Sequence, residues 1–208
     1  MLDVIGRLRT RSAYMAIREA AITVLKHDDF RIVHISIQGT HIHLLVEAEG
    51  RAALAKGMKA FEISAAKHLN AAVSKAGGWW ARVKLRRQGK PLPKRRKGRV
   101  FADRYHSTVI RTPKHARHEL AYVLNNWRKH GEHRKDAARG WKIDPFATGW
   151  LFQGWKEREG EPFAWKLRET YEPMPVWWPR TWLLKEGWRR YGLISTHEVP
   201  GKRFVARA

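Results

Sequence analysis

The 208-residue sequence contains no cysteine. This absence excludes a disulfide framework, a cysteine-ligated zinc site and thiol catalysis, and it fits a reducing compartment such as the cytoplasm. Long hydrophobic runs are missing as well, because no window of about 18 residues is apolar throughout. We therefore expect no membrane span and no membrane partner. The N-terminal segment also lacks the apolar stretch of a secretory signal.

Acidic residues are few. The chain has 19 Asp and Glu against 42 Lys and Arg, which gives a formal net charge of +23. Such an excess attracts polyanions and predicts binding that weakens as the salt concentration rises. Nucleic acid is the expected partner, since no basic amphipathic helix points to a membrane surface. With 43% hydrophobic residues, the chain can still build a folded core.

Hydrophobic periodicity predicts a helix, a hairpin and a second helix in the first third of the chain. Apolar residues recur at helical spacing in residues 10–28 and again in residues 51–75. Between these helices, residues 30–38 and 41–48 alternate apolar and polar side chains, which predicts two half-buried strands. Because only a short turn joins them, the two strands are expected to pair as an antiparallel hairpin.

A third strand is expected within residues 100–110 and a helix over residues 113–130. Thr112 can cap this helix, a proline follows in its first turn, and Gly131 suits its C-terminal stop. Residues 82–99 hold ten Lys or Arg and no acidic residue, together with prolines and glycines. This composition predicts an exposed, mobile basic loop.

The composition changes from about residue 140. Eight of the eleven tryptophans lie between Trp141 and Trp188, and prolines interrupt the same stretch. We therefore divide the chain into a domain over residues 1–135, with a basic insertion at about 76–98, and a tryptophan-rich, mostly helical C-terminal extension over residues 136–208.

Two histidines on the second predicted strand form a candidate metal site. His41 and His43 are two residues apart, so their side chains point to the same face of the strand. Imidazoles at this spacing can converge on one metal ion, but the ion needs a third ligand. A pair of exposed strand histidines gives the same pattern, so the motif alone leaves both interpretations open.

Tyr122 and Asn126 share a polar face of the helix over residues 113–130, because four residues separate them. A tyrosine can act as a covalent nucleophile when a base or a metal helps to remove its proton. The amide oxygen of Asn126 suits Mg²⁺ or Mn²⁺ as a third ligand, and His118 and Glu119 compete for that role. A tyrosine at the edge of the core would show the same spacing.

Three segments together resemble the HUH (His-hydrophobe-His) single-stranded DNA transposases, and within them the REP-associated tyrosine transposases. The segments are GTHIHLLVEA (39–48), GRVFADRYHSTVIRTP (98–113) and ELAYVLNNWRKHG (119–131). The resemblance covers about residues 10–131. It implies an α+β fold, a ferredoxin-like sandwich with an antiparallel sheet, in which the histidines lie on a central strand and the tyrosine on a helix beside it.

The resemblance also implies a metal-dependent strand transferase or endonuclease. His41, His43 and Asn126 would hold one Mg²⁺ or Mn²⁺, and Tyr122 would attack the scissile phosphate to give a 5′-phosphotyrosine link. The implied partner is single-stranded DNA folded as a REP-like hairpin, and the implied location is the cytoplasm, in association with the nucleoid. The residues expected to contact the DNA are Arg86, Arg87, Lys94, Arg95, Arg96, Arg104, His106, Arg111 and Lys129.

The sequence departs from the usual pattern of this family in two ways. The strand that usually precedes the first helix is not evident in MLDVIGRL, so we expect either that the sheet lacks its first strand or that the true start lies upstream. The basic insertion at about 76–98 is the second departure. The oligomeric state is open between a monomer and a homodimer.

Three alternatives remain open from the sequence. A domesticated descendant could bind DNA without catalysis, and a truncated remnant would not fold. A metallonuclease could use water in place of the tyrosine and would leave no covalent adduct. Glu47 and Glu119 are the acidic residues near the motif, which makes a site built on a water-activating carboxylate less favoured.

Overall fold

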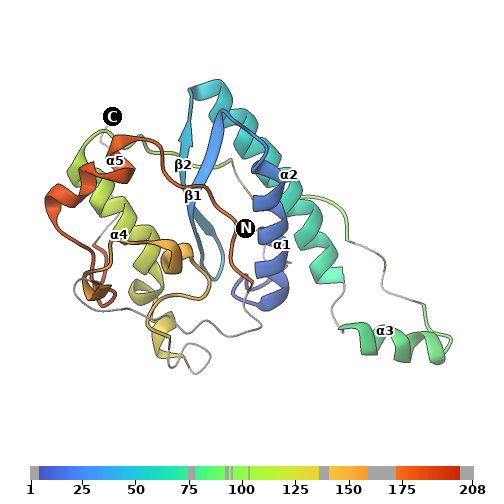
Figure 1. Cartoon of the computed structure of the whole chain (residues 1–208). Coiled ribbons are helices and arrows are strands. Elements are labelled where there is room, and N and C mark those ends of the chain that lie inside the picture. The colour runs from blue at the N-terminus through green and yellow to red at the C-terminus, as the bar shows by residue number, and fades with distance from the viewer. Residues whose placement is uncertain are drawn as a thin grey trace.

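The structure is a computed structural model, which describes residues 5–74, 78–91, 94, 96–102, 104–135, 141–158 and 172–201. Within these residues the fold is α+β, with helices packed on both faces of a two-stranded antiparallel sheet (Figure 1). The longer elements are α1 (Arg11–Val24), β1 (Phe30–Ile37), β2 (Ile42–Ala48), α2 (Arg51–Ser74), α3 (Gly78–Arg87) and α4 (Pro113–Lys129). The shorter ones are η2 (Glu132–Arg134), η4 (Thr148–Leu151), η5 (Lys156–Arg158), α5 (Trp182–Lys185) and η6 (Gly187–Tyr191).

The predicted hairpin is confirmed, and its register decides which side chains share a face. His34 lies opposite Leu45 and Ser36 lies opposite His43, while the register shifts around Val33. Because partners across an antiparallel pair point to the same side, these four paired residues share one face of the sheet. The opposite face carries the isoleucines of β1 and packs against α1 and α2.

The prediction of a half-buried strand is wrong for β1, since all eight of its residues are buried. Helices α1 and α2 cover one face, and Figure 1 shows α4 and α5 on the other side of the hairpin. A second core joins Val33 and Leu45 of the sheet to Leu120 of α4 and to Phe152 and Trp188 farther along the chain. The polar positions of β1 are therefore buried as well, because residues distant in sequence supply a second cover.

The outer edge of β1 is bonded by two segments from the last third of the chain. Ile37 donates its N–H to the carbonyl of Phe146 at 2.9 Å, and Trp177 donates its N–H to the carbonyl of Ile32 at 2.9 Å. Between these contacts, the hydroxyl of Thr148 accepts the Ile35 N–H at 3.1 Å. These contacts satisfy backbone groups that a bare sheet edge would expose. The described residues before α1 contain no strand.

Helix α4 begins and ends where its sequence predicts. The Thr112 hydroxyl accepts the His115 N–H at 3.2 Å, and Pro113 occupies the first turn. Gly131 adopts a φ of 66°, the left-handed conformation that terminates helices. The buried apolar side chains Leu120, Leu124 and Trp127 fix the rotation of α4 about its axis.

The third strand predicted within residues 100–110 is wrong, because residues 100–102 and 104–110 contain no strand. The Arg99 guanidinium donates to the carbonyls of Phe101 and Ala102, so these acceptors are already used. Alternation of side chains does not by itself supply a pairing partner, and no ladder joins this segment to β1 or β2 in the described part of the chain.

The basic loop predicted over residues 82–99 is wrong in its first part, which belongs to α3. Lysine, arginine and leucine are good helix formers, and cations in the last turn, such as Arg86 and Arg87, favour the helix dipole. Gly89, with a φ of 66°, follows the end of this helix. Figure 1 shows α3 standing apart from the other labelled elements.

Gly57 of α2 lets this helix pack directly on Phe30 of the sheet. A Cβ atom at this position would lie 2.1 Å from Cγ of the buried Phe30 ring. We expect Gly57→Ala to lower the free energy of unfolding by about 1–3 kcal/mol, because overpacking outweighs the gain of about 1 kcal/mol in helix propensity. Urea unfolding measures this change.

Gly39→Ala is the matched control, because no atom lies within 4 Å of its added Cβ. We expect its free energy of unfolding to change by less than about 0.5 kcal/mol. An increase in stability for Gly57→Ala would contradict the close packing of α2 on Phe30.

Candidate functional site

Two histidines converge where β2 begins. Nε2 of His41 lies 3.0 Å from Nε2 of His43, and the ring centroids are 4.6 Å apart. Adjacent ligands of an octahedral ion, each at about 2.1 Å from the metal, lie about 3.0 Å apart. On the far side of the His41 ring, Nδ1 lies 3.3 Å from the hydroxyl of Thr40. The 3.0 Å separation is that of a hydrogen bond between the two rings, and it also matches the separation of two adjacent ligands of one divalent ion.

Helix α4 places Tyr122 against the second histidine. The Tyr122 ring centroid is 5.2 Å from that of His43, with the planes at 80°. His118 stacks on the tyrosine ring at 6.4 Å, and Nζ of Lys129 lies 4.8 Å from the centre of the same ring. These neighbours leave Tyr122 only 8% exposed, so the polar face expected from the sequence is largely covered.

Asn126 lies one turn beyond Tyr122 on α4 and is 0% exposed. Neither Oδ1 nor Nδ2 of its side chain has a hydrogen-bond partner in the described part of the molecule. By contrast, Nδ2 of Asn125 donates to the carbonyl of Ser195 at 2.9 Å. A buried amide without partners costs about 1–3 kcal/mol, and such a group calls for an explanation such as a bound ion. Together with two imidazoles, its oxygen fits the donor set of Mg²⁺ or Mn²⁺.

The competing third ligands, His118 and Glu119, interact with one another. Oε1 of Glu119 lies 3.4 Å from Nδ1 of His118 and 3.6 Å from Nε2 of His115. Among the described residues, no group of three or more His, Cys, Asp or Glu side chains is arranged to hold a metal ion. Asn126 is of another residue type, so its candidacy depends on its burial and its lack of partners.

Glu47, the other carboxylate near the motif, is occupied elsewhere. It accepts the backbone N–H groups of Arg180 and Thr181, each at 2.8 Å, and the Thr181 hydroxyl at 2.7 Å. The side chain is buried and secures the chain just before α5. Glu47 thus has a structural role, and its carboxylate is not positioned to activate water beside the histidines.

His130 is a functional candidate that the sequence reasoning missed. It caps the C-terminal end of α4, and its ring centroid lies 6.0 Å from that of His41. The positions of Tyr122, Asn126 and His130 repeat every four residues, and this spacing could have revealed it. His130 adds an exposed ring beside the two histidines.

The residues predicted to contact DNA fall into separate places. Lys129 lies beside Tyr122, and its Nζ also donates to the carbonyl of Gly201 at 3.1 Å. The Arg96 guanidinium donates to the Asn70 side chain and to the carbonyl of Arg99, so it braces the end of α2. The other described members are exposed: Arg86, Arg87, Lys94, Arg104, His106 and Arg111. Arg95 lies outside the described residues.

The arrangement joins two imidazoles, a phenol and an ammonium group within one cluster, and the buried amide of Asn126 follows the phenol by one turn of α4. Such a set can hold a divalent cation beside a tyrosine hydroxyl. No helix in the described ranges is long and apolar enough to cross a bilayer. Comparisons with models of known families, with curated proteins and with solved structures find no match to this chain.

Proposed function

We propose that this chain is a metal-dependent single-stranded DNA strand transferase or endonuclease of the HUH type, similar to the REP-associated tyrosine transposases. The observation that carries the proposal is the position of His43, whose ring contacts both His41 and Tyr122. Candidate ligands from the start of β2 and the residue before it therefore share one site with a candidate nucleophile from α4. We further propose that residues 1–135 form a ferredoxin-like catalytic domain and residues 136–208 its tryptophan-rich extension.

The proposed metal ligands are His41, His43 and Asn126. The 3.0 Å separation of the two Nε2 atoms and the unpartnered amide of Asn126 support this set. When bound, Mg²⁺ or Mn²⁺ would polarise the scissile phosphate and stabilise the charge that develops on it. Thr40 supports the orientation of the His41 ring through its Nδ1 atom.

The proposed nucleophile is the phenol oxygen of Tyr122. It would attack phosphorus, so that an O–P bond to tyrosine forms as the bond from phosphorus to the 3′-oxygen breaks. The phenolic proton is lost and the departing 3′-oxygen gains a proton, which leaves a 5′-phosphotyrosine and a free 3′-OH. The Lys129 ammonium lies 4.8 Å from the ring centre, where its positive charge can attract the scissile phosphate.

This chemistry suits single-stranded hairpin DNA. The bond energy is kept in the phosphotyrosine, so another 3′-OH can reverse the step and rejoin strands without ATP. The net charge of +23 supports a polyanionic partner. A DNA substrate would place the protein at the nucleoid in the cytoplasm, and the monomer and the homodimer both remain compatible with one site per chain.

A metal-dependent adduct assay tests the proposal. We expect labelled hairpin DNA with an unpaired flank to give a slowly migrating, protease-sensitive band with wild-type protein and Mn²⁺. Chelation by EDTA should abolish the band, and His41→Ala/His43→Ala should reduce it at least about 100-fold, because two ligands are lost. A Mn²⁺ titration of the same variants without DNA should show loss of binding in the double mutant.

His27→Ala/His68→Ala is the matched control, because His27 follows α1 and His68 lies in α2, the two helices on the side of the sheet away from α4 (Figure 1). It should keep both the adduct and the Mn²⁺ binding. Tight hairpin binding without an adduct in the wild type would contradict catalysis and favour the DNA-binding descendant. Metal-dependent nicking without an adduct would favour the nuclease that uses water.

A further inference from the structure

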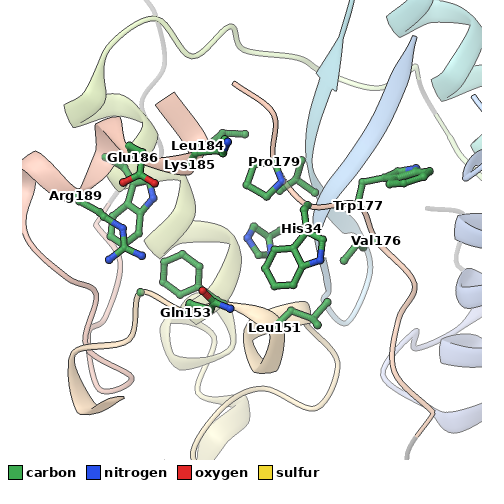
Figure 2. Close-up of a pocket in the computed structure, with 15 residues that line it drawn as sticks. His34, Leu151, Gln153, Val176, Trp177, Pro179, Leu184, Lys185, Glu186 and Arg189 are labelled. Atoms are coloured by element: carbon green, nitrogen blue, oxygen red, sulfur yellow. The ribbon is translucent and has the colours of Figure 1, made fainter. Parts of the chain in front are cut away.

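A cavity of about 250 Å³ opens between β1 and the segments that cover it. In Figure 2, Val176 and Trp177 lie on one side of His34, and Leu184 and Arg189 lie on the other. The volume lies below the roughly 300–1,000 Å³ typical of pockets for drug-sized ligands. It therefore suits a ligand with a single planar ring system.

Aromatic side chains form much of the wall and the mouth of this cavity. Phe152 and Trp188 are buried in the wall, whereas Trp178 is 62% exposed and Trp177 is 39% exposed. An exposed indole offers a flat apolar face, and each nucleobase that stacks on such a face contributes about 1–3 kcal/mol to binding. The exposed indoles therefore suit a flat aromatic ligand.

The rim of the cavity is positively charged on balance. Lys185 and Arg189 are exposed there, and Glu186 is the acidic residue among the lining side chains. The Arg189 guanidinium stacks on the Trp188 ring at 4.9 Å, which holds this cation beside the cavity. A ligand with a planar ring inside and an anionic group outside would match this distribution.

His34 lines the cavity and is the histidine among its lining residues. Its Nδ1 lies 2.9 Å from the Thr148 hydroxyl, while no hydrogen bond to Nε2 occurs within the described residues. Burial lowers the pKa of His34 to about 4, so the ring is neutral near pH 7. A neutral imidazole with one occupied nitrogen can make one further hydrogen bond, to the edge of a base.

The cavity lies next to the candidate active site. His34 and Ser36 point to the same face of the sheet, and Ser36 is paired with His43. Diagonal neighbours on one face of an antiparallel pair are about 7–8 Å apart, which is the relation between His34 and His43. This separation is comparable to the spacing of neighbouring nucleotides in an extended strand.

We propose that this cavity binds one unpaired base of single-stranded DNA. The base stacks on Trp178, its edge bonds to Nε2 of His34, and the adjoining phosphate lies beside Lys185 and Arg189. The inference rests on the proposed function and deepens it, because it assigns a second contact to the unpaired strand that flanks the hairpin.

A double-mutant cycle of binding affinities tests this proposal, with one change in the protein and one in the DNA. EDTA is present throughout, so that no cleavage occurs. We expect Trp178→Ala to weaken binding of a hairpin with an unpaired flank about 10-fold, within the range for one stacked base. Removing the base from the flank should weaken binding to the wild-type protein by the same factor. Trp178→Ala should then bind the abasic and the intact flank with equal affinity. Trp182→Ala is the matched control, because Trp182 is 50% exposed but does not line the cavity.

The charged rim gives a second readout. Lys185→Ala/Arg189→Ala should reduce the slope of log K against log salt by about 1.4, the value for two phosphate contacts on a single strand. The proposal would be overturned if the losses of binding free energy caused by Trp178→Ala and by the abasic flank were additive. It would also be overturned if the protein bound a free nucleoside monophosphate more tightly than the DNA flank. If the two changes are not additive but the wild-type protein forms no Mn²⁺-dependent adduct, the proposed catalysis is contradicted and the base-binding cavity is not.

Discussion

Tyr122→Phe is expected to abolish the covalent protein–DNA adduct, at least about 1,000-fold, because it removes the only atom that forms the new bond to phosphorus. The phenol hydroxyl has no hydrogen bond to the described residues, whereas the ring contacts to His43, His118 and Lys129 do not need it. The free energy of unfolding should therefore change by less than about 1 kcal/mol. A denaturing gel measures the adduct, and a thermal melt measures stability.

Hairpin binding should be unchanged in Tyr122→Phe, since the substitution leaves the charge of the protein intact. Tyr191→Phe is the matched control, because Tyr191 is exposed in η6 and away from the histidines. It should keep the full adduct yield. If Tyr122→Phe still formed the adduct, another side chain would be the nucleophile. If it nicked DNA without an adduct, water would be the nucleophile.

Asp144→Ala is expected to lower the free energy of unfolding by about 3 kcal/mol, because it removes the bidentate partner of the buried Arg9 guanidinium and leaves Glu132, 3.4 Å from Nε, as its counter-charge. Nη1 and Nη2 of Arg9 donate to the two carboxylate oxygens of Asp144 at 2.9 and 2.8 Å. Asp144 also accepts the Phe146 N–H at 2.9 Å, and the Phe146 carbonyl in turn bonds to Ile37. The substitution should thus loosen the cover of the β1 edge as well. Urea unfolding provides the measurement.

Two comparisons make this result specific to the buried pair. Arg9→Met/Asp144→Leu should recover most of the loss, since it removes both buried charges while Glu132 keeps its ion pairs with Arg7 and Lys135. Lys56→Ala breaks an exposed ion pair with Asp29, in which the charged atoms are 3.9 Å apart, and should cost less than about 1 kcal/mol. A loss below about 1 kcal/mol for Asp144→Ala would show that the Arg9 pair does not support the fold.

Local sequence patterns predicted the elements whose signals lie within a few residues. The helical periodicity of α1 and α2, the short turn of the hairpin and the capping of α4 by Thr112 each depend on neighbours in the chain. The shared face of His41 and His43 and that of Tyr122 and Asn126 follow from the strand and helix periods in the same way. These features needed no knowledge of the tertiary contacts.

Errors arose where the environment of a segment comes from far along the chain. The alternation in β1 predicted a half-buried strand, but Thr148, Phe152 and Trp177 cover its second face and its edge. The strand expected within residues 100–110 has no partner edge in the described structure. Burial and pairing depend on distant segments, so periodicity alone cannot supply them.

The sequence by itself determined the basic character of the chain, its main helices, its hairpin and the side chains that share each local face. Only the tertiary structure decided that α4 packs against the face of β2 that carries His43, which places Tyr122 5.2 Å from that ring and adds His130. It also decided that the tryptophan-rich segments close over β1 and form the cavity around His34. The physical reason is that side-chain direction follows from local backbone geometry, whereas the meeting of two elements depends on how the whole core packs.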